Sequence, residues 1–483
     1  MKSKIALVIN NFTWFGKRAF RTWLPAIPII TTLLKNDYDF TIVDANVNEW
    51  DFDQMRDAIK ESHADMILIS ALSIDYQVQY HKLASLAKEA LPNCITLMGG
   101  VYPTSLPDQV LKDVNVDYII QGYAEERLVH VINAILNEDY KELNVIEGIG
   151  YVREGEKHLI PFTKYLADCR SIIRPDYRLI DVPKYFKLQS KYNAKNYSTE
   201  CSEKRSVNII SSYGCSYNCF FCANRALSGS RIVYRPIEDV IDEIDYFVKN
   251  YNIQQISFMD DNIVADKNRA KALFREIIKR EYNIEIQIGN LAAWDLDDEI
   301  LKLLHDAGCT RIGISVESGS QQVLYNIMHK PLNLNIIPNL VRMFKKYDIM
   351  MIADFIIGLP GEKWEDIRAS MNYAKNMGAD LCNINIAVPY PGTELYAYMT
   401  ENNLLPEEFK FDEKFFVNGL VKTSEFTPAE LKILVAFEWE NINAGTPEKR
   451  ERAKKVLRLS DKQLDDYCRD MRLGAIRFAK KYS

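Results

Sequence analysis

The sequence predicts an α/β protein: an N-terminal doubly wound sheet, then a partial (β/α)6 barrel, then a helical C-terminal region. Two observations predict this architecture. The 483 residues exceed the ~250–300 residues at which a single core stops growing, which indicates more than one domain. Short β-branched runs alternate with amphipathic stretches over most of the chain, and such alternation is typical of parallel sheets covered by helices.

The first domain is predicted over residues 1–145. Strand–helix alternation there predicts a Rossmann-like sheet, in which ligands bind at the carboxyl ends of the strands. The predicted strands are Ile5–Asn10, Phe40–Ala45, Met66–Ser70, Ile95–Gly99 and Tyr118–Gly122, and the predicted helices are Leu24–Lys35, Asp53–Glu61, Gln77–Leu91 and Glu125–Asn137.

Two of these strand ends carry residues suited to a ligand. Ser70-Ala71-Leu72 follows the third predicted strand, and Gly99-Gly100 follows the fourth. Glycines at such positions let a ligand approach the backbone closely. Taken alone, ordinary tight turns are the simpler explanation.

A linker is predicted over residues 146–206. Within it, Glu147–Ile160 alternates polar and apolar residues around three glycines, which predicts a β-hairpin. The stretch Lys191–Arg205 is polar and lysine-rich, and we expect a solvated loop.

The second domain is predicted over residues 207–400, and amphipathic helices are predicted over 401–483. In barrels of this kind, chemistry takes place at the carboxyl ends of the strands. The predicted strands are Val207–Ser212, Gln255–Met259, Ile284–Ile288, Arg311–Val316, Ile349–Ile357 and Leu381–Val388. The predicted helices are Arg235–Asn250, Lys267–Arg280, Asp297–Ala307, Gln321–Met328, Asn335–Tyr347, Trp364–Asn376, Thr427–Asn443, Pro447–Leu457 and Asp461–Lys481.

Three cysteines, Cys215, Cys219 and Cys222, follow the first strand of the second domain at spacing C-x3-C-x2-C. Three thiolates on one loop are soft ligands, suited to an iron–sulfur cluster or to zinc. Zinc requires a fourth ligand, and no further Cys or His follows before His305. Three ligands therefore favour a four-iron cluster with one open iron. The alternative is three unrelated buried thiols.

Composition excludes several classes of function. A net charge of −6 gives no reason to expect a nucleic-acid partner, and no apolar run reaches the roughly 20 residues of a membrane span. Nine cysteines without a paired framework indicate a reducing, cytoplasmic location. Only Cys468 lies in the C-terminal region, so we expect no second cluster there. The remaining cysteines outside the loop are predicted to be buried apolar side chains: Cys94, Cys169, Cys201, Cys309, Cys382 and Cys468.

The cysteine spacing, together with the aromatic Phe221, resembles the signature of the radical S-adenosylmethionine (SAM) superfamily. The resemblance implies that Cys215, Cys219 and Cys222 hold a 4Fe-4S cluster whose open iron is chelated by SAM. It also implies that Phe221 lies near the adenine, and that an electron donor such as flavodoxin or ferredoxin reduces the cluster.

Polar residues at later strand ends match this pattern in order. The resemblance implies that Asp260 and Asp261 bind the amino group of SAM, and that Glu317 and Ser318 contact its ribose. Gly358 begins a variant of the motif that contacts adenine. From the residues alone, paired carboxylates could equally cap the next helix. A buried Glu is costly unless it is paired. Trp294, at another strand end, is predicted either to line a substrate pocket or to pack in the core.

The first domain resembles the cobalamin-binding domain, in which S-x-L is followed by G-G. Here Ser70 and Leu72 precede Gly99 and Gly100, and 26 residues separate Leu72 from Gly99. The family motif D-x-H-x-x-G is absent, so cobalamin is expected to lack a histidine lower ligand. The acidic glycine turn of the branch is altered here, where Gly122 begins G-Y-A-E-E. The resemblance implies cobalamin contacts at these five residues.

Together, the two resemblances predict a cobalamin-dependent radical SAM enzyme. They imply reductive SAM cleavage to a 5′-deoxyadenosyl radical and methylation of an unactivated carbon of a small molecule from a natural-product or cofactor pathway. One alternative is a non-methylating dehydratase, cyclase or rearrangement enzyme that keeps the cobalamin domain as a scaffold. Another is a module whose cluster only passes electrons. The tail contains no RNA-binding β domain, and the N-terminal region contains no cysteine triad, which argues against methylthiolating relatives.

Overall fold

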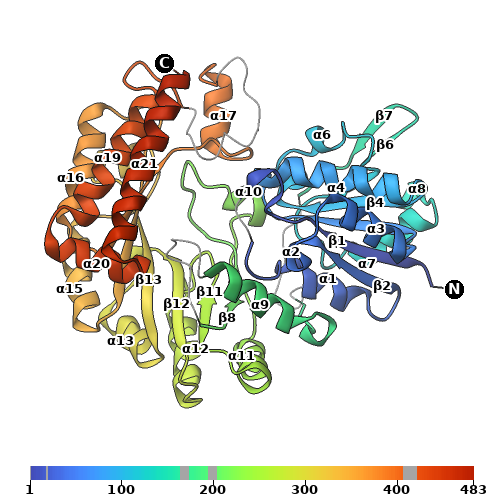
Figure 1. The fold of residues 1–483 in the computed structure, drawn as a ribbon, viewed down its shortest axis with the longest axis horizontal. Coiled ribbons are helices and arrows are strands. Elements are labelled where there is room, and N and C mark those ends of the chain that lie inside the picture. The colour runs from blue at the N-terminus through green and yellow to red at the C-terminus, as the bar shows by residue number, and fades with distance from the viewer. Residues whose placement is uncertain (1, 18–19, 164–172, 194–203, 406–420, 483) are drawn as a thin grey trace. The chain divides into compact units, whose positions relative to one another are not determined.

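The computed structural model describes residues 2–17, 20–163, 173–193, 204–405 and 421–482. These residues divide into two compact units, the first made mainly of Met1–Ala194 and the second mainly of the chain that follows (Figure 1). Each unit contains one large sheet. Cys169, Cys201 and most of the predicted Lys191–Arg205 loop lie outside the described residues.

The first unit contains a seven-stranded sheet in the order β2-β1-β3-β4-β5-β6-β7. The strands β1 to β5 are parallel, which confirms the Rossmann-like prediction, and the antiparallel pair β6–β7 continues the same sheet. The hairpin predicted at Glu147–Ile160 is therefore correct, and it belongs to the sheet. The strands are β1 (Lys4–Ile9), β2 (Asp39–Asp44), β3 (Met66–Ala71), β4 (Ile95–Gly100), β5 (Tyr118–Ile120), β6 (Ile149–Arg153) and β7 (Glu156–Leu159).

All four predicted helices of the first unit form, and five short or flanking helices are found beside them in its described residues. Helix α3 begins at Asp51, whose side chain and that of Gln54 cap each other's backbone N–H groups. The helices are α1 (Ala26–Leu34), α2 (Ala45–Asn48), α3 (Phe52–Ser62), α4 (Gln77–Ala90), α5 (Val101–Ser105), α6 (Pro107–Val110), α7 (Leu128–Leu136), α8 (Tyr140–Leu143) and α9 (Val182–Asn193).

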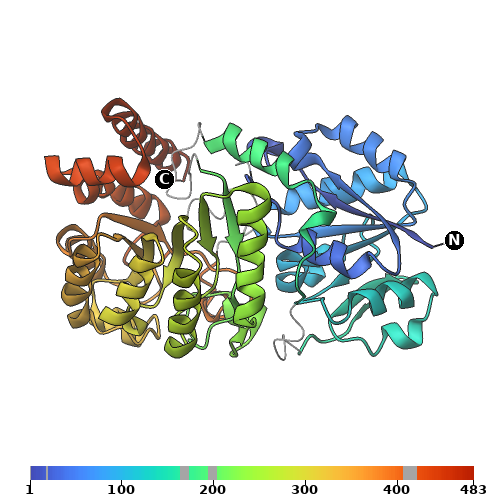
Figure 2. The same ribbon diagram turned by 90° about the horizontal axis from the view of Figure 1, so that it is seen from below.

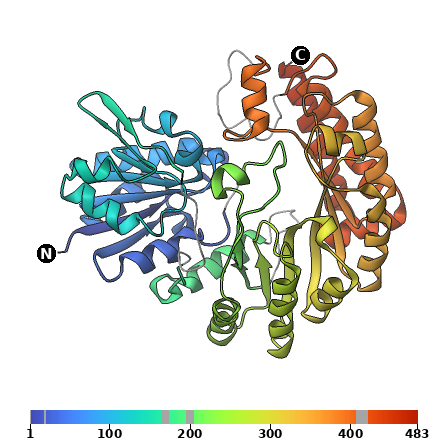
Figure 3. The same cartoon turned by 180° about the vertical axis from the view of Figure 1, so that it is seen from behind.

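The second unit contains a six-stranded sheet in the order β15-β14-β13-β12-β11-β8, and every neighbouring pair is parallel. This confirms the partial barrel. Seen from behind, its strands run in sequence order from green to orange (Figure 3). The strands are β8 (Ser206–Ile209), β11 (Gln255–Phe258), β12 (Glu285–Leu291), β13 (Cys309–Glu317), β14 (Met350–Ile357) and β15 (Leu381–Ile386), and a small antiparallel pair joins β9 (Ser212–Tyr213) to β10 (Val233–Tyr234).

The longer helices that connect successive strands of this sheet lie along its outside (Figure 1). Several begin at an acidic or hydroxyl side chain that caps them, as Asp266 does for α12 and Thr427 does for α19. The helices are α10 (Asn224–Ser228), α11 (Ile237–Tyr251), α12 (Lys267–Lys279), α13 (Asp298–Asp306), α14 (Gln321–Asn326), α15 (Ile337–Lys346), α16 (Trp364–Asn376), α17 (Glu394–Glu401), α19 (Pro428–Ala444), α20 (Pro447–Leu457) and α21 (Asp461–Tyr482).

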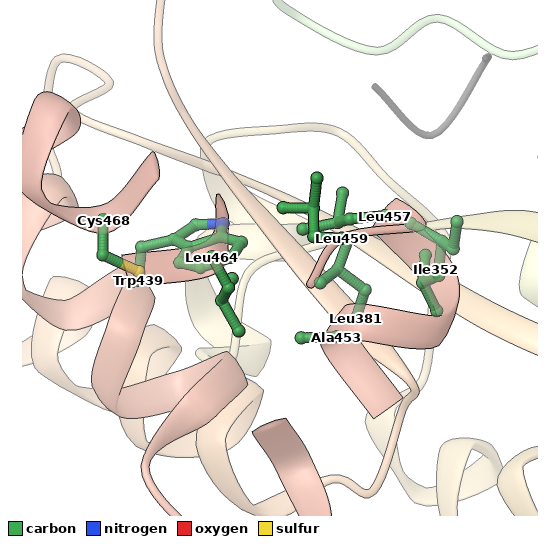
Figure 4. Close-up of a cluster of buried hydrophobic side chains, with 9 residues drawn as sticks. Ile352, Leu381, Trp439, Ala453, Leu457, Leu459, Leu464 and Cys468 are labelled. Carbon is green, nitrogen blue, oxygen red and sulfur yellow. The ribbon is translucent and has the colours of Figure 1, made fainter. Parts of the chain in front are cut away.

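The three C-terminal helices pack against the inner face of β14 and β15. Ile352 and Leu381, which are register partners on these strands, share one buried cluster with side chains of α19, α20 and α21 (Figure 4). The next residue of β15, Cys382, points the other way, because its Sγ lies 3.4 Å from the α16 carbonyl oxygen of Ala374. The helices α19 to α21 therefore cover part of the concave side, where Figure 2 shows them together at one end of the sheet. This cluster also contains Trp439, Ala453, Val456, Leu457, Leu459, Leu464 and Cys468.

Among the described residues, no helix combines the length and the apolar character that crossing a membrane requires. Four of the cysteines outside the loop are buried, as predicted: Cys94, Cys309, Cys382 and Cys468.

Candidate functional site

The cysteine loop is fixed by contacts from several strand ends of the second unit. The Gly214 N–H donates to Asp261 Oδ2 (2.9 Å), and the Asn218 amide donates to Glu394 Oε1 (2.7 Å). At Phe220, the N–H donates to the Met328 carbonyl oxygen and the carbonyl oxygen accepts from the Leu395 N–H. These contacts order the loop before any ligand binds, which lowers the entropy cost of binding one.

The three thiols of this loop influence one another. Burial, offset in part by the positive charge of Lys330, raises the pKa of Cys219 to about 11, and the neighbouring thiolates and Glu317 contribute to the rise. Cys215 and Cys222 have pKa values raised mainly by burial and in part by thiolate or carboxylate neighbours. No group of three or more His, Cys, Asp or Glu in the described chain is gathered closely enough for a single metal ion. A four-iron cluster spaces its ligand sulfurs more widely, because each sulfur bonds to a different iron.

The two aspartates after β11 face different surroundings. Asp260 is buried and accepts hydrogen bonds from Ser211 N, Ser211 Oγ and Ser212 Oγ, so its carboxylate ties β11 to the chain after β8. Asp261 accepts from Gly214 N at the start of the cysteine loop. Burial raises the pKa of both groups. Asp261 is thus the better placed of the two predicted SAM contacts, and Asp260 holds the strand ends together.

Glu317 ends β13 in a strained conformation. Its φ of 70° is left-handed, which is unusual for a residue with a side chain, and it sits at a register shift between β13 and β14. Its buried carboxylate pairs with the buried ammonium of Lys330 at 3.2 Å. Backbone strain of this kind clusters at functional sites. The pair supplies the partner that a buried Glu requires, and the sequence did not reveal it.

Lys330 lies beside the cysteine loop. Its positive charge lowers the pKa of all three loop thiols and that of Asp354. Its Nζ also lies 5.4 Å from the ring centre of Trp294, which is within the range of a cation–π contact. A buried cation at this position suits an anionic group of a ligand bound near the cysteines.

Ser318 and Gly358, two other predicted SAM contacts, have structural partners. The buried Ser318 hydroxyl meets Ser370 Oγ at 3.0 Å and accepts from Ser320 N, so it packs the loop against α16. Gly358 has φ +87°, and an added Cβ would lie 2.5 Å from Leu431 Cδ1, so both conformation and packing require glycine.

The backbone after β14 is fixed by a buried acid. Glu362 Oε2 accepts from Gly358 N (2.6 Å) and Leu359 N (2.7 Å), and burial raises the pKa of this carboxyl to about 7. The other oxygen, Oε1, is buried and has no hydrogen-bond partner among the described residues. The loop that the sequence assigns to adenine is therefore preorganised by Glu362.

A row of polar side chains crosses the inner face of the sheet one step beyond Ile352 and Leu381. Asp354 and Asn383 are register partners, and the Asn383 amide donates to Asp354 Oδ1 (2.9 Å). Ser315 is level with Asp354 and donates to Asn290. Burial raises the pKa of Asp354 to about 6. This row places hydrogen-bonding groups inside the barrel. They lie short of the carboxyl ends of the strands, which is the side where the cysteine loop is found.

In the first unit, the predicted cobalamin residues meet at the carboxyl edge of β3 and β4. Ser70 is level with Gly99, and Ala71 with Gly100. Gly100 has φ +106°, and an added Cβ would lie 2.6 Å from the Ala71 carbonyl oxygen. Close packing between strands therefore requires this glycine, whether or not a ligand binds. Leu72 is half-buried just beyond β3.

Gly122 and Asn10 complete this edge. The Gly122 N–H donates to Thr104 Oγ1 (2.8 Å), which also donates to the Gly100 carbonyl oxygen, so α5 joins the ends of β4 and β5. Asn10 follows β1 and is fully buried, yet neither atom of its amide has a partner among the described residues. A side-chain amide without a hydrogen-bond partner at this edge is suited to a ligand such as cobalamin, because the amides of cobalamin can donate and accept hydrogen bonds. The sequence analysis did not select Asn10.

The first unit contains four histidines, all among the described residues. Of the four in the first unit, His81 is engaged at both ring nitrogens, by Asp113 and Tyr102, and His130 pairs with Glu142. His63 precedes β3 at its amino end, and His158 lies in β7.

Two family models match the chain. The model of the radical SAM superfamily matches residues 209–374, and that of the B12 binding domain matches residues 23–132. Similar proteins include an uncharacterized methyltransferase of Pyrococcus horikoshii, 25% identical over 89% of this chain and 90% of its own length. Another is the cytidylyl-2-hydroxyethylphosphonate methyltransferase of Streptomyces wedmorensis, 24% identical over 82% of this chain and 79% of its own.

Solved structures show the same fold over most of the chain. The radical SAM methyltransferase TsrM of Kitasatospora setae, with cobalamin and a [4Fe-4S] cluster bound, has a TM-score of 0.69 at 17% identity, covering 83% of this chain and 78% of its own. The cobalamin-dependent radical enzyme OxsB has a TM-score of 0.72 at 16% identity, covering 98% of this chain and 72% of its own.

These matches define the class: a radical SAM enzyme that also carries a B12-binding domain. Its two matched domains together are the combination that the cobalamin-binding branch of the radical SAM superfamily has. Its cofactors are a 4Fe-4S cluster, SAM and cobalamin. The residues present fit these groups, since the second unit offers three thiols on one preorganised loop beside a buried cation, and the first offers an open amide at a Rossmann-like strand edge.

Proposed function

We propose that this protein is a cobalamin-dependent radical SAM methyltransferase that acts on an unactivated carbon of a small molecule. The observation that carries the proposal is the presence of both domains in one chain, matched over 89% and 82% of its length by two relatives named as methyltransferases. When bound, a reduced cluster would supply the electron for cleavage of SAM, and cobalamin would supply a carrier for the methyl group.

The residues of the second unit have separate tasks in this proposal. Cys215, Cys219 and Cys222 hold the cluster, and Phe221 lies against the adenine of SAM. Asp261 orients the amino group, because its carboxylate already lies at the start of the cysteine loop.

The Lys330–Glu317 pair is proposed to hold the carboxylate and the ribose of SAM. Lys330 offers a buried positive charge to the carboxylate of SAM. Glu317 commits Oε1 to Lys330, which leaves Oε2 to accept a hydrogen bond from a ribose hydroxyl. Charge-assisted hydrogen bonds of this kind are stronger than neutral ones.

Isotope transfer tests the proposal. The protein, with cluster and cobalamin loaded under anaerobic conditions, is incubated with a reductant, a small-molecule extract of its host and SAM labelled in the methyl group. A metabolite whose mass gains the labelled methyl group supports methylation. Cleavage of SAM with no labelled product, in protein that retains cobalamin, refutes it.

A second candidate is a radical cyclase or rearrangement enzyme. It is favoured by similarity to the anaerobic magnesium-protoporphyrin IX monomethyl ester cyclase of Cereibacter sphaeroides, 24% identical over 89% of this chain and 68% of that one. In that case a metabolite is consumed without gaining label. A third candidate, an electron-transfer module, predicts no SAM cleavage at all.

A further inference from the structure

Tyr217 lies between the first two cysteines of the loop, and its hydroxyl has two partners. It accepts a hydrogen bond from the indole N–H of Trp294 (2.6 Å) and donates to the carboxylate of Asp295, at 3.0 Å from Oδ2 and 3.2 Å from Oδ1. The two rings meet edge to face, with centres 4.9 Å apart. A half-buried residue of the cysteine loop is thus attached to the segment that follows β12.

Asp295 is fixed in turn by a second strand end. Its Oδ2 accepts from the Asn262 amide (2.7 Å), and Asn262 is a buried residue that directly follows Asp261. The Tyr217 hydroxyl therefore meets a carboxylate whose position is already determined. Such a chain of hydrogen bonds holds its members more firmly than one isolated bond does.

Trp294 has a second contact on its ring face. The Nζ of Lys330 lies 5.4 Å from the centre of its ring, and the same Nζ pairs with Glu317 at 3.2 Å. One indole therefore bonds the cysteine loop through its N–H and faces the buried cation through its ring. The direction of the N–H bond fixes the plane of the ring that Lys330 meets.

We propose that Tyr217 is a positioning residue that couples the cysteine loop to the Lys330–Glu317 pair through Trp294. By orienting the indole, it fixes where the ammonium of Lys330 stands relative to the cluster, and so how SAM sits on the open iron. The proposal rests on the cluster and SAM contacts proposed above, but not on the fate of the methyl group.

The test uses Tyr217→Phe and Trp294→Phe in the full-length, cluster-loaded protein. Both remove a hydrogen bond and keep an aromatic ring. Tyr282→Phe is the matched control. The Tyr282 hydroxyl also donates to an aspartate, Asp245, but this aspartate belongs to α11 and not to the cysteine loop or its partners. Iron content, SAM affinity by equilibrium dialysis and the electron paramagnetic resonance spectrum with saturating SAM are measured for each.

We expect Tyr217→Phe to keep its iron and to bind SAM about 3- to 30-fold more weakly, since an indole N–H and a carboxylate lose their partner. The change that saturating SAM produces in the spectrum should also become smaller, which a loss of stability alone would not cause. Trp294→Phe should act in the same direction, and Tyr282→Phe should match the wild type.

A double-mutant cycle decides whether the coupling passes through Lys330. If it does, adding Tyr217→Phe to Lys330→Met should weaken SAM binding by no more than about twofold, so the two effects fall short of their product. The proposal is overturned if the two substitutions weaken SAM binding by the product of their single effects. It is also overturned if Tyr217→Phe binds SAM as tightly as the wild type. If Tyr217→Phe loses iron, Trp294→Phe decides, and unchanged SAM affinity there overturns it as well. Unchanged affinity in Lys330→Met alone instead refutes the proposed SAM contact.

Discussion

Replacing Lys330 by methionine should destabilise the second unit by about 3–5 kcal/mol, because it leaves the buried carboxylate of Glu317 without a countercharge. The structure gives the scale. Nζ and Oε1 are 3.2 Å apart, and at an effective dielectric constant of about 20 their attraction is of the order of 5 kcal/mol. Both side chains are at most 7% exposed, so water offers little compensation.

Amide hydrogen exchange of β13 and β14 in the cofactor-free protein measures this cost, because it reports the opening of one unit without requiring the whole chain to unfold in a single step. The double variant Lys330→Met, Glu317→Leu should regain most of the loss, since no unpaired charge remains. Lys346→Met is the control. Lys346 pairs with Asp298 at the surface, where both are more than half exposed, and its loss should cost under about 1 kcal/mol. A Lys330→Met cost equally small would contradict the calculation.

Three further predictions concern the other strand ends. Changing all three cysteines of Gly214–Ala223 to alanine should abolish the four bound irons, measured after anaerobic reconstitution; irons that persist would exclude these ligands. The raised pKa of Glu362, about 7 against a usual 4.5, means that the folded state binds its proton more tightly. Its contribution to the free energy of unfolding, about 3 kcal/mol, is therefore present below pH 4.5 and lost as the pH rises through 7. Thermal unfolding measured over this pH range should show the loss of stability in the wild type but not in Glu362→Gln. Gly100→Ala should lower stability even without cobalamin, because its Cβ meets the backbone at 2.6 Å, whereas Ser70→Tyr should block hydroxocobalamin binding, measured by absorption, and leave the fold intact.

The strands and longer helices could be predicted from the sequence because their signals are local. Alternation, β-branched runs and capping residues place most boundaries within about two residues of those observed, as with the predicted Gln77–Leu91 and the observed Gln77–Ala90. The cysteine loop could be predicted for the same reason, since its spacing is contained in eight residues. The parallel direction of β1 to β5 and of the strands of the second sheet follows from the alternation, whereas the order of the strands in the first sheet does not.

The separate roles of the residues in the site could not be predicted from the sequence. Asp260 and Asp261 are neighbours in the chain. Only the hydrogen bonds from Ser211 and Ser212, which follow β8, show that the Asp260 carboxylate holds two strand ends together. Lys330 lies 13 residues after Glu317 in a segment with no sequence signal. Its return to the strand end depends on how α14 packs, which is a tertiary effect.

The remaining hydrogen-bonding capacity of the site indicates what kind of ligand it can accept. Glu317 uses one oxygen for Lys330, and Asp354 uses one for Asn383. The second oxygen of each accepts no hydrogen bond from the residues that the structure describes. A ligand that covers these oxygens buries them, and buried carboxylate oxygens are costly when they stay unpaired, so a molecule that binds deep in this barrel gains most by bringing hydrogen-bond donors. The ribose hydroxyls of SAM meet that requirement at Glu317. At Asp354, one step further from the strand ends, we expect the substrate to bring a hydroxyl or an amine of its own.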